Sequence, residues 1–415
     1  MRNLGFLVLI AAALGAAVCA RSAPVPNARL WTDGDRVVFL GDSITHGGAY
    51  PEYISLYYAT RFPDQNVWFS NSGLGGATAK EGIAAIDEDI VAKKPTVVAV
   101  MFGMNDVHPN AWPRMGKSNE LTAAQKNAID AFSANMTNLV TQIRAKANFP
   151  EIVYATPSPY DQKCIDGDRE ADVVCNDGLK ILSEKIRAWA KRDGAMCVDL
   201  QARICELNAR KQLKDPSFSI LRRENASLDR VHPGALGHMA FAYYWLMSQG
   251  APTMVSRIDV NSATLGTVRS KGAEVTDVKG DRRGVTFTAL EKALPYPFSD
   301  AMFKVNELVP FVDSLDQEIL SIRNLRGGEY EVKIDGVSVG SWPGVVLGRG
   351  VNLATCFKAP QYAQAQRARE INARIWALER TRPKRPETYA ALELARIELR
   401  DAVKPVPHDF EIIRR

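Results

Sequence analysis

An almost uninterrupted apolar segment, residues 96–102 (TVVAVMF), constrains the fold of this chain more than any other feature. Such a run indicates a strand covered on both faces, as in a parallel sheet flanked by helices. Shorter apolar runs at residues 37–40 and 152–156 predict two further strands. Helix-like segments at residues 50–61 and 122–147 lie between the predicted strands. This alternation predicts βαβ units and a doubly wound parallel sheet.

Polar residues follow two of these strands. Residues 41–43 (Gly-Asp-Ser) leave the first strand, and Asn105 leaves the strand at residues 96–102. Because ligands bind at the carboxyl ends of strands in open α/β sheets, Ser43 is a candidate nucleophile. The Asn105 amide is an uncharged donor suited to a developing oxyanion. Each residue also has a structural alternative, since Ser43 could cap a helix and Asn105 could form an Asx-turn.

A glycine-rich turn, residues 71–78 (NSGLGGAT), follows another predicted strand at residues 66–69. Glycines let a backbone approach a ligand closely or adopt a positive φ. The segment lacks the glycine spacing and the lysine of a phosphate-binding loop. A tight turn without a function is the alternative.

Asp229 and His232 lie three residues apart, just before Pro233 and an apolar helix. A carboxylate at this spacing can reach one imidazole nitrogen and leave the other free to take a proton from a serine. Of the five histidines, only His232 has an aspartate in this arrangement. The alternative is an ordinary surface or core histidine.

Taken together, these four segments resemble the four sequence blocks of the SGNH, or GDSL-type, hydrolases. The blocks occur in the family order and span roughly residues 36–249. The resemblance implies an SGNH hydrolase-like, three-layer α/β/α fold with a parallel sheet in flavodoxin-like order. Residues 41–45 lack the second glycine of G-x-S-x-G, which disfavours the common α/β-hydrolase class.

The resemblance also implies a mechanism of ester hydrolysis through an acyl-serine. Ser43 would be the nucleophile, His232 the general base and then acid, and Asp229 the residue that orients the imidazole. The oxyanion hole would comprise the backbone amides of Ser43 and Gly76 together with the Asn105 side chain.

The choice of Gly76 depends on a detail of the resemblance. Gly76 begins the Gly-x-Thr ending that is usual in the family. Gly75 and Gly73 remain alternatives, since both lie in the same turn.

The N-terminus predicts export. Residues 1–20 combine one early basic residue, a short apolar core and a small residue at position 20, as in a secretory signal peptide cleaved after Ala20. A membrane anchor is the alternative, but the run is short for a bilayer span. A lipid-modified Cys19 is disfavoured by the bulky Val18. We expect a periplasmic or extracellular protein without a stable membrane span.

Removal of Cys19 with the signal leaves five cysteines, and this odd count predicts at least one free thiol or an intermolecular bond. Cys164 with Cys175, and Cys197 with Cys205, are close enough in sequence to pair, but sequence leaves the pairing open. No Cys-x-x-Cys or His/Cys cluster has zinc spacing, so we expect neither a metal nor another cofactor. The oligomeric state is left open.

Composition and charge divide the chain into parts. We expect an SGNH hydrolase domain at residues 30–252, a small β-rich appendage at 256–358 and a helical tail at 359–415. Basic residues in the tail alternate with glutamates, and the formal net charge is only +5. This pattern is typical of a solvated helix face, so we expect no nucleic-acid partner.

The substrate is predicted less directly. Exported SGNH hydrolases with extra domains often resemble carbohydrate O-deacetylases, and His108, Trp112 and Tyr160 on loops are candidates for sugar contacts, although each could pack internally instead. The leading hypothesis is an exported serine esterase that removes O-acetyl groups from glycans. The alternatives are a short-chain lipase or arylesterase of the same family, or an inactive SGNH-fold glycan-binding protein.

Overall fold

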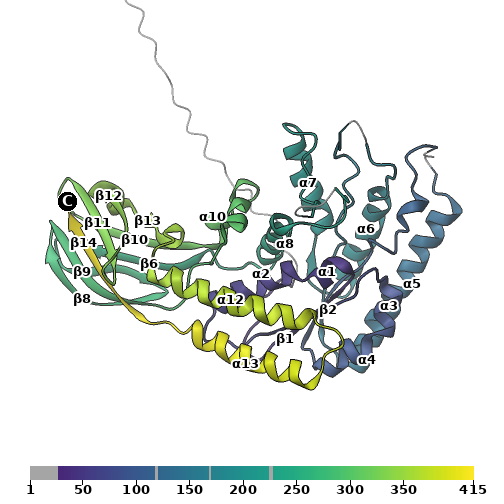
Figure 1. The fold of residues 1–415 in the computed structure, drawn as a ribbon, viewed down its shortest axis with the longest axis horizontal. Coiled ribbons are helices and arrows are strands. Elements are labelled where there is room, and N and C mark those ends of the chain that lie inside the picture. Colours follow the sequence, from purple (N-terminus) through teal and green to yellow (C-terminus); the bar gives the residue numbers. More distant parts are fainter. Residues whose placement is uncertain (1–26, 117–119, 168–169, 224–227) are drawn as a thin grey trace, which may run out of the picture.

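The computed structural model describes residues 27–116, 120–167, 170–223 and 228–415. The predicted signal peptide, residues 1–20, lies outside the described residues. The molecule is elongated, with an α/β lobe at one end and a β lobe at the other (Figure 1).

The α/β lobe contains a five-stranded parallel sheet in the order β2-β1-β3-β4-β5. Its strands are β1 (Arg36–Gly41), β2 (Trp68–Gly73), β3 (Val97–Met101), β4 (Glu151–Ala155) and β5 (Cys197–Val198). The order and direction of these strands confirm the predicted doubly wound sheet.

Helices cover both faces of this sheet, and the side chains of β1 alternate between them. Val37 and Phe39 face the cluster that contains α2 (Ala49–Arg61) and α8 (Ala235–Ser248), whereas Val38 and Leu40 face the cluster that contains α5 (Ala123–Lys146) and α6 (Asn176–Arg192). This gives the predicted three layers. The helices of the lobe are α1 (Ser43–Gly47), α2 (Ala49–Arg61), α3 (Ala79–Ala84), α4 (Ile86–Asp89), α5 (Ala123–Lys146), α6 (Asn176–Arg192), α7 (Leu200–Gln212) and α8 (Ala235–Ser248).

The β lobe consists of two sheets that share one apolar core. One sheet has the order β13-β10-β6-β7 and the other β12-β11-β14-β9-β8. Its elements are β6 (Met254–Asn261), β7 (Gly266–Lys271), β8 (Ala273–Asp281), β9 (Gly284–Glu291), β10 (Gln317–Arg323), β11 (Glu329–Ile334), β12 (Val337–Pro343), α11 (Gly344–Arg349), β13 (Val351–Asn352) and β14 (Pro407–Arg414). Two short helices between β9 and β10, α9 (Asp300–Phe303) and α10 (Phe311–Leu315), contribute instead to the apolar core of the α/β lobe, where α9 packs on α8.

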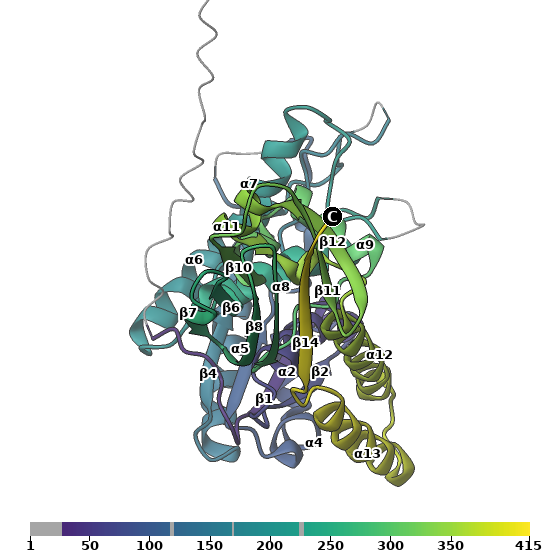
Figure 2. The same cartoon turned by 90° about the vertical axis from the view of Figure 1, so that its left-hand side faces the viewer.

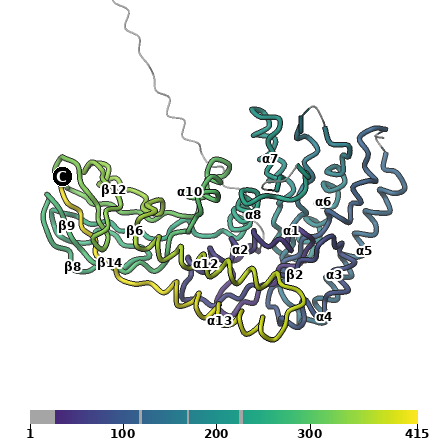
Figure 3. The backbone as a smooth tube through the Cα atoms, viewed as in Figure 1, coloured from purple at the N-terminus to yellow at the C-terminus, as the bar shows by residue number. Residues whose placement is uncertain are grey.

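Between β13 and β14 the chain returns to the α/β lobe. Helices α12 (Pro360–Arg380) and α13 (Pro386–Ala402) form a C-terminal hairpin, and α12 packs on α2 and β2. The turned view shows the hairpin beside these two elements, and the backbone trace shows the chain leaving it to end in the β lobe (Figures 2 and 3).

The prediction of a helical tail over residues 359–415 is therefore wrong at its end. Strand β14 lies between β9 and β11 in the β lobe. His408, Phe410 and Ile412 alternate inward along it, and Phe410 stacks on Phe287 with ring centroids 4.9 Å apart. The predicted range of the appendage, residues 256–358, is therefore too short, because it leaves out β14, a central strand of one of its sheets. Among the described residues, no helix is both long and apolar enough to cross a membrane.

Candidate active site

Ser43 lies at the junction of β1 and α1. Asp42 is the N-cap of α1, and its Oδ1 accepts a hydrogen bond of 2.9 Å from the Ile44 amide. Capping is therefore the role of Asp42, which leaves the hydroxyl of Ser43 available for another partner. Burial raises the pKa of the Asp42 carboxyl to about 6. Gly41 allows the tight exit from the strand, because a Cβ there would lie 2.6 Å from the carbonyl oxygen of Met101.

The structure brings Ser43, His232 and Asp229 into one hydrogen-bonded chain. The Oγ of Ser43 lies 2.8 Å from Nε2 of His232, and Nδ1 of His232 lies 2.7 Å from Oδ2 of Asp229. All three side chains are half-buried. This geometry would allow the serine proton to move to Nε2 while the carboxylate fixes the imidazole.

The Asp229 carboxylate is itself held by the loop before α8. Its Oδ1 accepts from the backbone amides of Val231, at 3.0 Å, and of His232, at 2.9 Å. Burial acts to raise the pKa of Asp229, but hydrogen bonds from His232 and the backbone outweigh it and lower the pKa below its usual value. Asp229 is therefore ionised near neutral pH and can stabilise an imidazolium.

Two arginines at this loop were missed by the sequence analysis. Nε of Arg223 lies 3.3 Å from Oδ2 of Asp229. Arg230 adopts a positive φ of 63°, and its buried guanidinium donates to the carbonyl oxygen of Asp161 at 3.0 Å. The latter contact ties the histidine loop to the loop that follows β4. No spacing rule singles out these arginines, because their partners are set by the tertiary fold.

The glycine turn lies beside Ser43, because the Leu74 amide donates to the Gly41 carbonyl at 2.9 Å. Gly73 is excluded as an oxyanion donor, since its amide already donates to Oδ1 of Asn71 at 2.8 Å. Gly75 and Gly76 are exposed, and Gly76 has a φ of 73°. Within the described part of the chain no hydrogen bond occupies either amide. Gly76 stays the predicted donor, with Gly75 as the alternative.

The Asn105 side chain adjoins the same turn. Its Nδ2 donates to the carbonyl oxygen of Ala77 at 2.8 Å, which uses one of the two amide hydrogens. Next to it, the buried Asp106 accepts from the Ala79 amide at 3.0 Å, and burial raises the pKa of Asp106 to about 7. Both contacts fasten the exit of β3 to the glycine turn and α3.

The three predicted sugar-contact residues fare differently. Trp112 is only 5% exposed, its Nε1 donates to the Val107 carbonyl at 2.9 Å, and its ring packs against Gly178. Trp112 is thus a core residue, so the hypothesis of sugar stacking on it is wrong. His108 is exposed and Tyr160 half-buried, so both are still accessible to a substrate.

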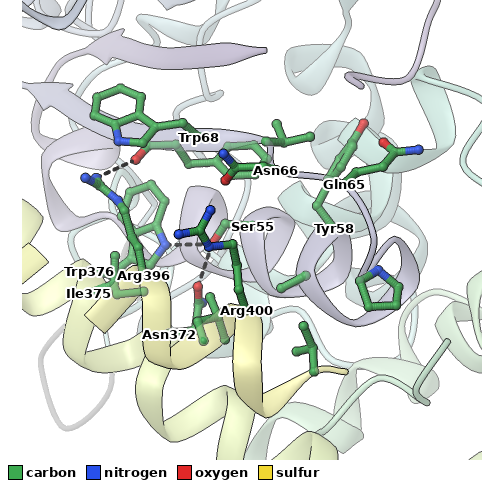
Figure 4. A pocket seen from close by; sticks show the side chains of 16 residues that line it. Ser55, Tyr58, Gln65, Asn66, Trp68, Asn372, Ile375, Trp376, Arg396 and Arg400 are labelled. Carbon is green, nitrogen blue, oxygen red and sulfur yellow. Dashed lines mark hydrogen bonds between the residues drawn. The ribbon is translucent and has the colours of Figure 1, made fainter. Parts of the chain in front are cut away.

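A cavity lies elsewhere, between α2, β2 and the C-terminal hairpin (Figure 4). Tyr58, Trp68 and Trp376 contribute to its aromatic lining, with Arg396 and Arg400 on the hairpin side. No residue of the Ser43–His232–Asp229 chain lines this cavity, so we do not assign the chemistry to it.

The five described cysteines are all free thiols, so neither of the two pairs considered from the sequence forms a disulfide. Cys164 donates instead to the Ser217 carbonyl at 3.2 Å. Across residues 27–116, 120–167, 170–223 and 228–415, no group of three or more His, Cys, Asp or Glu residues is arranged to hold a metal ion.

The parallel sheet and a serine, histidine and aspartate joined at its carboxyl edge define a hydrolase architecture of the SGNH type. Residues 39–240 match the sequence model of the GDSL-like lipase/acylhydrolase family, and this part of the chain belongs to that family. The match confirms the resemblance inferred from the four sequence blocks. It supports assignment of the chain to the esterases.

Individual relatives extend the comparison. The chain is 24% identical over 241 residues to an acetylxylan esterase of Geobacillus stearothermophilus, covering 54% of this chain and 98% of the relative. A solved structure of BT4096, a gut microbial diltiazem-metabolizing enzyme, is 28% identical with a TM-score of 0.82, covering 93% of this chain and 99% of that one. A mutant structure of Axe2, an acetyl-xylooligosaccharide esterase from Geobacillus, is 24% identical with a TM-score of 0.41, covering 53% of this chain and 95% of that one.

Proposed function

We propose that this chain is an exported serine esterase that removes O-acetyl groups from carbohydrates through an acyl-serine intermediate. The observation that carries the proposal is the continuous hydrogen-bonded chain from Ser43 through His232 to Asp229. The acetylxylan esterase relative supports the substrate class. The predicted signal peptide at residues 1–20 supports export, which would bring the enzyme to extracellular or periplasmic glycans.

In the proposed acylation step, His232 takes the Ser43 proton as Oγ attacks the ester carbonyl carbon. The tetrahedral oxyanion receives hydrogen bonds from the amides of Ser43 and Gly76 and from the free hydrogen of the Asn105 amide. The imidazolium is stabilised by Asp229 and gives its proton to the departing sugar oxygen. Water activated by His232 then attacks the acyl group, and acetate leaves as Ser43 is regenerated.

A second candidate is an esterase of small, non-carbohydrate esters. It is favoured by the similarity to the diltiazem-metabolizing enzyme, which extends through both lobes of the chain. Diltiazem carries an acetate ester, so both candidates predict acetyl transfer to Ser43 and differ only in the alcohol. A short-chain lipase of the same family also falls within this second candidate. The inactive glycan-binding alternative is disfavoured by the intact Ser43–His232 contact.

The test is hydrolysis of a chromogenic acyl series, from acetyl to octanoyl, by the mature protein and by Ser43→Ala. Acetate release from acetylated xylan and from diltiazem is measured alongside. The proposal predicts a preference for acetyl esters, release of acetate from the glycan, and loss of nearly all activity in Ser43→Ala.

The alternatives predict different results. Acetyl preference with release from diltiazem but not from the glycan would favour the small-ester candidate. A preference for longer chains would favour a lipase. Equal activity in Ser43→Ala would contradict the serine mechanism, and binding of the glycan without any hydrolysis would favour the binding-protein alternative.

A further inference from the structure

The end of α12 and the turn that joins it to α13 contact β2 and α1, the two elements that lead into the candidate active site. This turn belongs to the C-terminal hairpin, more than 130 residues beyond the family match that ends at residue 240. Glu379, at the end of α12, is only 2% exposed. Its Oε2 accepts from Ser70 Oγ at 2.8 Å and from the Asn71 amide at 3.3 Å, both on β2. The carboxylate thus fixes the strand just before the glycine turn.

Asn71 connects this strand to both parts of the site. Its Nδ2 donates to the carbonyl oxygens of Thr45, at 3.1 Å, and His46, at 3.2 Å, in the helix that begins at Ser43. Its Oδ1 accepts from the Gly73 amide at 2.8 Å, at the start of the glycine turn. One buried side chain therefore sets the distance between the helix of the nucleophile and the proposed oxyanion donors.

Cations surround Glu379 and keep it ionised. Arg396 Nη2 lies 2.7 Å from Oε1, and Lys384 Nζ lies 3.3 Å from Oε2. Burial acts to raise the pKa of Glu379, but Lys384 and Arg396 outweigh it, so the pKa lies below its usual value. Lys93 contributes less, and burial lowers its own pKa to about 7. Lys93 also donates to the Asn71 carbonyl at 2.8 Å. An ionised acceptor makes stronger hydrogen bonds than a neutral one, so the hold on β2 is firm.

The next residues of the same turn make two further contacts. Arg380 Nη1 donates to the carbonyl oxygen of Gly47, the last residue of α1, at 3.2 Å. Arg382 forms an ion pair with Asp89, and Ser72 Oγ donates to the Asp89 carbonyl at 2.6 Å. Residues 379–382 thus contact both α1 and the strand that leads into the glycine turn.

We propose that Glu379 is a positioning residue for the glycine turn, which carries the proposed oxyanion donor Gly76. Glu379 acts through Asn71, so that the C-terminal hairpin completes the active site of the α/β lobe. The proposal rests on the proposed function only in taking Ser43 as the reactive nucleophile. It gives the hairpin a role in turnover as well as in packing.

The hairpin offers a control within the same helix. About one turn before Glu379, α12 is fixed to α2 by Trp376 Nε1, which donates to Ser55 Oγ at 2.6 Å (Figure 4). Nearer its start, Gln364 is 6% exposed, and its Nε2 donates to the carbonyls of Ala402 and Lys404, each at 2.8 Å. Fifteen residues of helix separate Gln364 from Glu379, about 22 Å along the axis. Gln364→Ala should therefore weaken the hairpin without touching the turn.

The test compares Glu379→Ala, Glu379→Gln and Gln364→Ala in the full mature chain. Each is assayed for kcat and KM on an acetyl ester, for the rate of Ser43 labelling by an aryl organophosphate, and for melting temperature. An organophosphate forms a tetrahedral centre at Ser43. The rate of labelling therefore reports on the glycine turn even if acetate esters are poor substrates. We expect Glu379→Ala to lower kcat and labelling by about tenfold with little change in KM, as a small displacement of reacting groups does.

Glu379→Gln, which keeps an acceptor oxygen, should recover part of that loss. Gln364→Ala should lower the melting temperature while leaving kcat and labelling unchanged. If Glu379→Ala does not fold, Ser70→Ala removes one bond to the carboxylate and should give a smaller loss in the same direction. The proposal is overturned if a folded Glu379→Ala, or Ser70→Ala in its place, is labelled at the wild-type rate. It is also overturned if Gln364→Ala lowers the labelling rate as much as Glu379→Ala does. Labelling without acetate hydrolysis in the wild type would contradict the proposed function alone, whereas an unlabelled wild type would contradict both.

Discussion

At the residue scale, Asp42 and Ser43 have separate roles, helix capping and contact with the histidine, although the sequence allowed Ser43 to fill either one. Asp42 caps α1 through the Ile44 amide, and Ser43 directs its hydroxyl to His232. The sequence left capping and catalysis as alternatives for Ser43, because both place a hydroxyl at a strand exit. The structure separates them, since the cap is already occupied. The same argument applies to Gly73, whose amide is taken by Asn71.

Asn105 provides a test of the proposed oxyanion hole. Asn105→Ala removes the side-chain donor and should lower kcat by about 10²-fold, the usual cost of losing one such donor. KM should change little, because the bond forms mainly in the transition state. Steady-state kinetics on an acetyl ester measure both constants. An unchanged kcat in a folded variant would remove Asn105 from the oxyanion hole.

His238 gives a prediction about pH and stability. Its imidazole lies in α8 near Tyr50, with parallel rings 6.2 Å apart, and burial, aided by His232 and Arg380, lowers its pKa to about 3. The unfolded chain, with an ordinary histidine pKa near 6.5, binds more protons between these values, so the free energy of unfolding must fall as pH falls through this range. The slope from this group is at most about 1.4 kcal/mol per pH unit.

The matched variant is His238→Phe, which keeps an aromatic ring. Urea unfolding of both proteins at about pH 5 and about pH 7 should show a smaller loss of stability on acidification in the variant. An equal loss in the two proteins would mean that His238 is not buried in its neutral form.

At the scale of elements, the site depends on how closely β2 approaches α1. A Cβ on Gly73 would lie 2.1 Å from the His46 amide nitrogen, so no larger residue fits without moving the helix. Gly47, on the same helix, has no atom within 4 Å of such a Cβ. Alanine at Gly73 crowds β2 against α1, whereas alanine at Gly47 crowds nothing. Comparing the two variants therefore separates the effect of crowding from the general effect of replacing glycine with alanine.

Gly73→Ala should destabilise the protein by roughly 1–3 kcal/mol, as overpacking does, and should also lower kcat because it displaces α1. Gly47→Ala should change stability by less than about 1 kcal/mol and leave kcat intact. Chemical denaturation and initial rates measure the two effects. Similar results for the two variants would contradict the close approach of β2 to α1.

Elements also show what could be predicted from the sequence. The strands of the α/β lobe were predictable because apolar runs such as residues 96–102 carry a local signal, and the four blocks carry local chemistry. Strand β14 was missed because it follows two helices and pairs only with distant strands. Trp112 and Glu379 were unpredictable in a different way, since a loop tryptophan or a glutamate in a charged helix acquires its role only from tertiary contacts.

At the scale of the whole molecule, the chain crosses between the lobes more than once. It leaves the α/β lobe after α8, returns to its core through α9 and α10, returns again as the C-terminal hairpin, and ends in the β lobe as β14 (Figure 1). Because β14 lies between β9 and β11, the last residues hold that sheet together. The hairpin is thereby fixed at both ends, which favours a constant position for Glu379.

A chain ending at Val403 tests this connection. It removes β14, including the buried Phe410 and Ile412, each contributing about 1.5–3 kcal/mol by burial. The β lobe should lose its cooperative unfolding, bind a hydrophobic dye and become sensitive to protease. Deletion of Arg415 alone is the control and should have no such effect. A truncated chain with the same protease resistance as the full chain would contradict the central place of β14.

The central claim is that Ser43 is the nucleophile, activated by His232. The most direct measurement is intact and peptide mass spectrometry after reaction with an aryl organophosphate, with the wild type, Ser43→Ala and His232→Ala compared. We predict one phosphoryl adduct per chain, located on Ser43, absent from Ser43→Ala and formed far more slowly in His232→Ala. An adduct on another residue, or equal labelling of Ser43→Ala, would contradict the account.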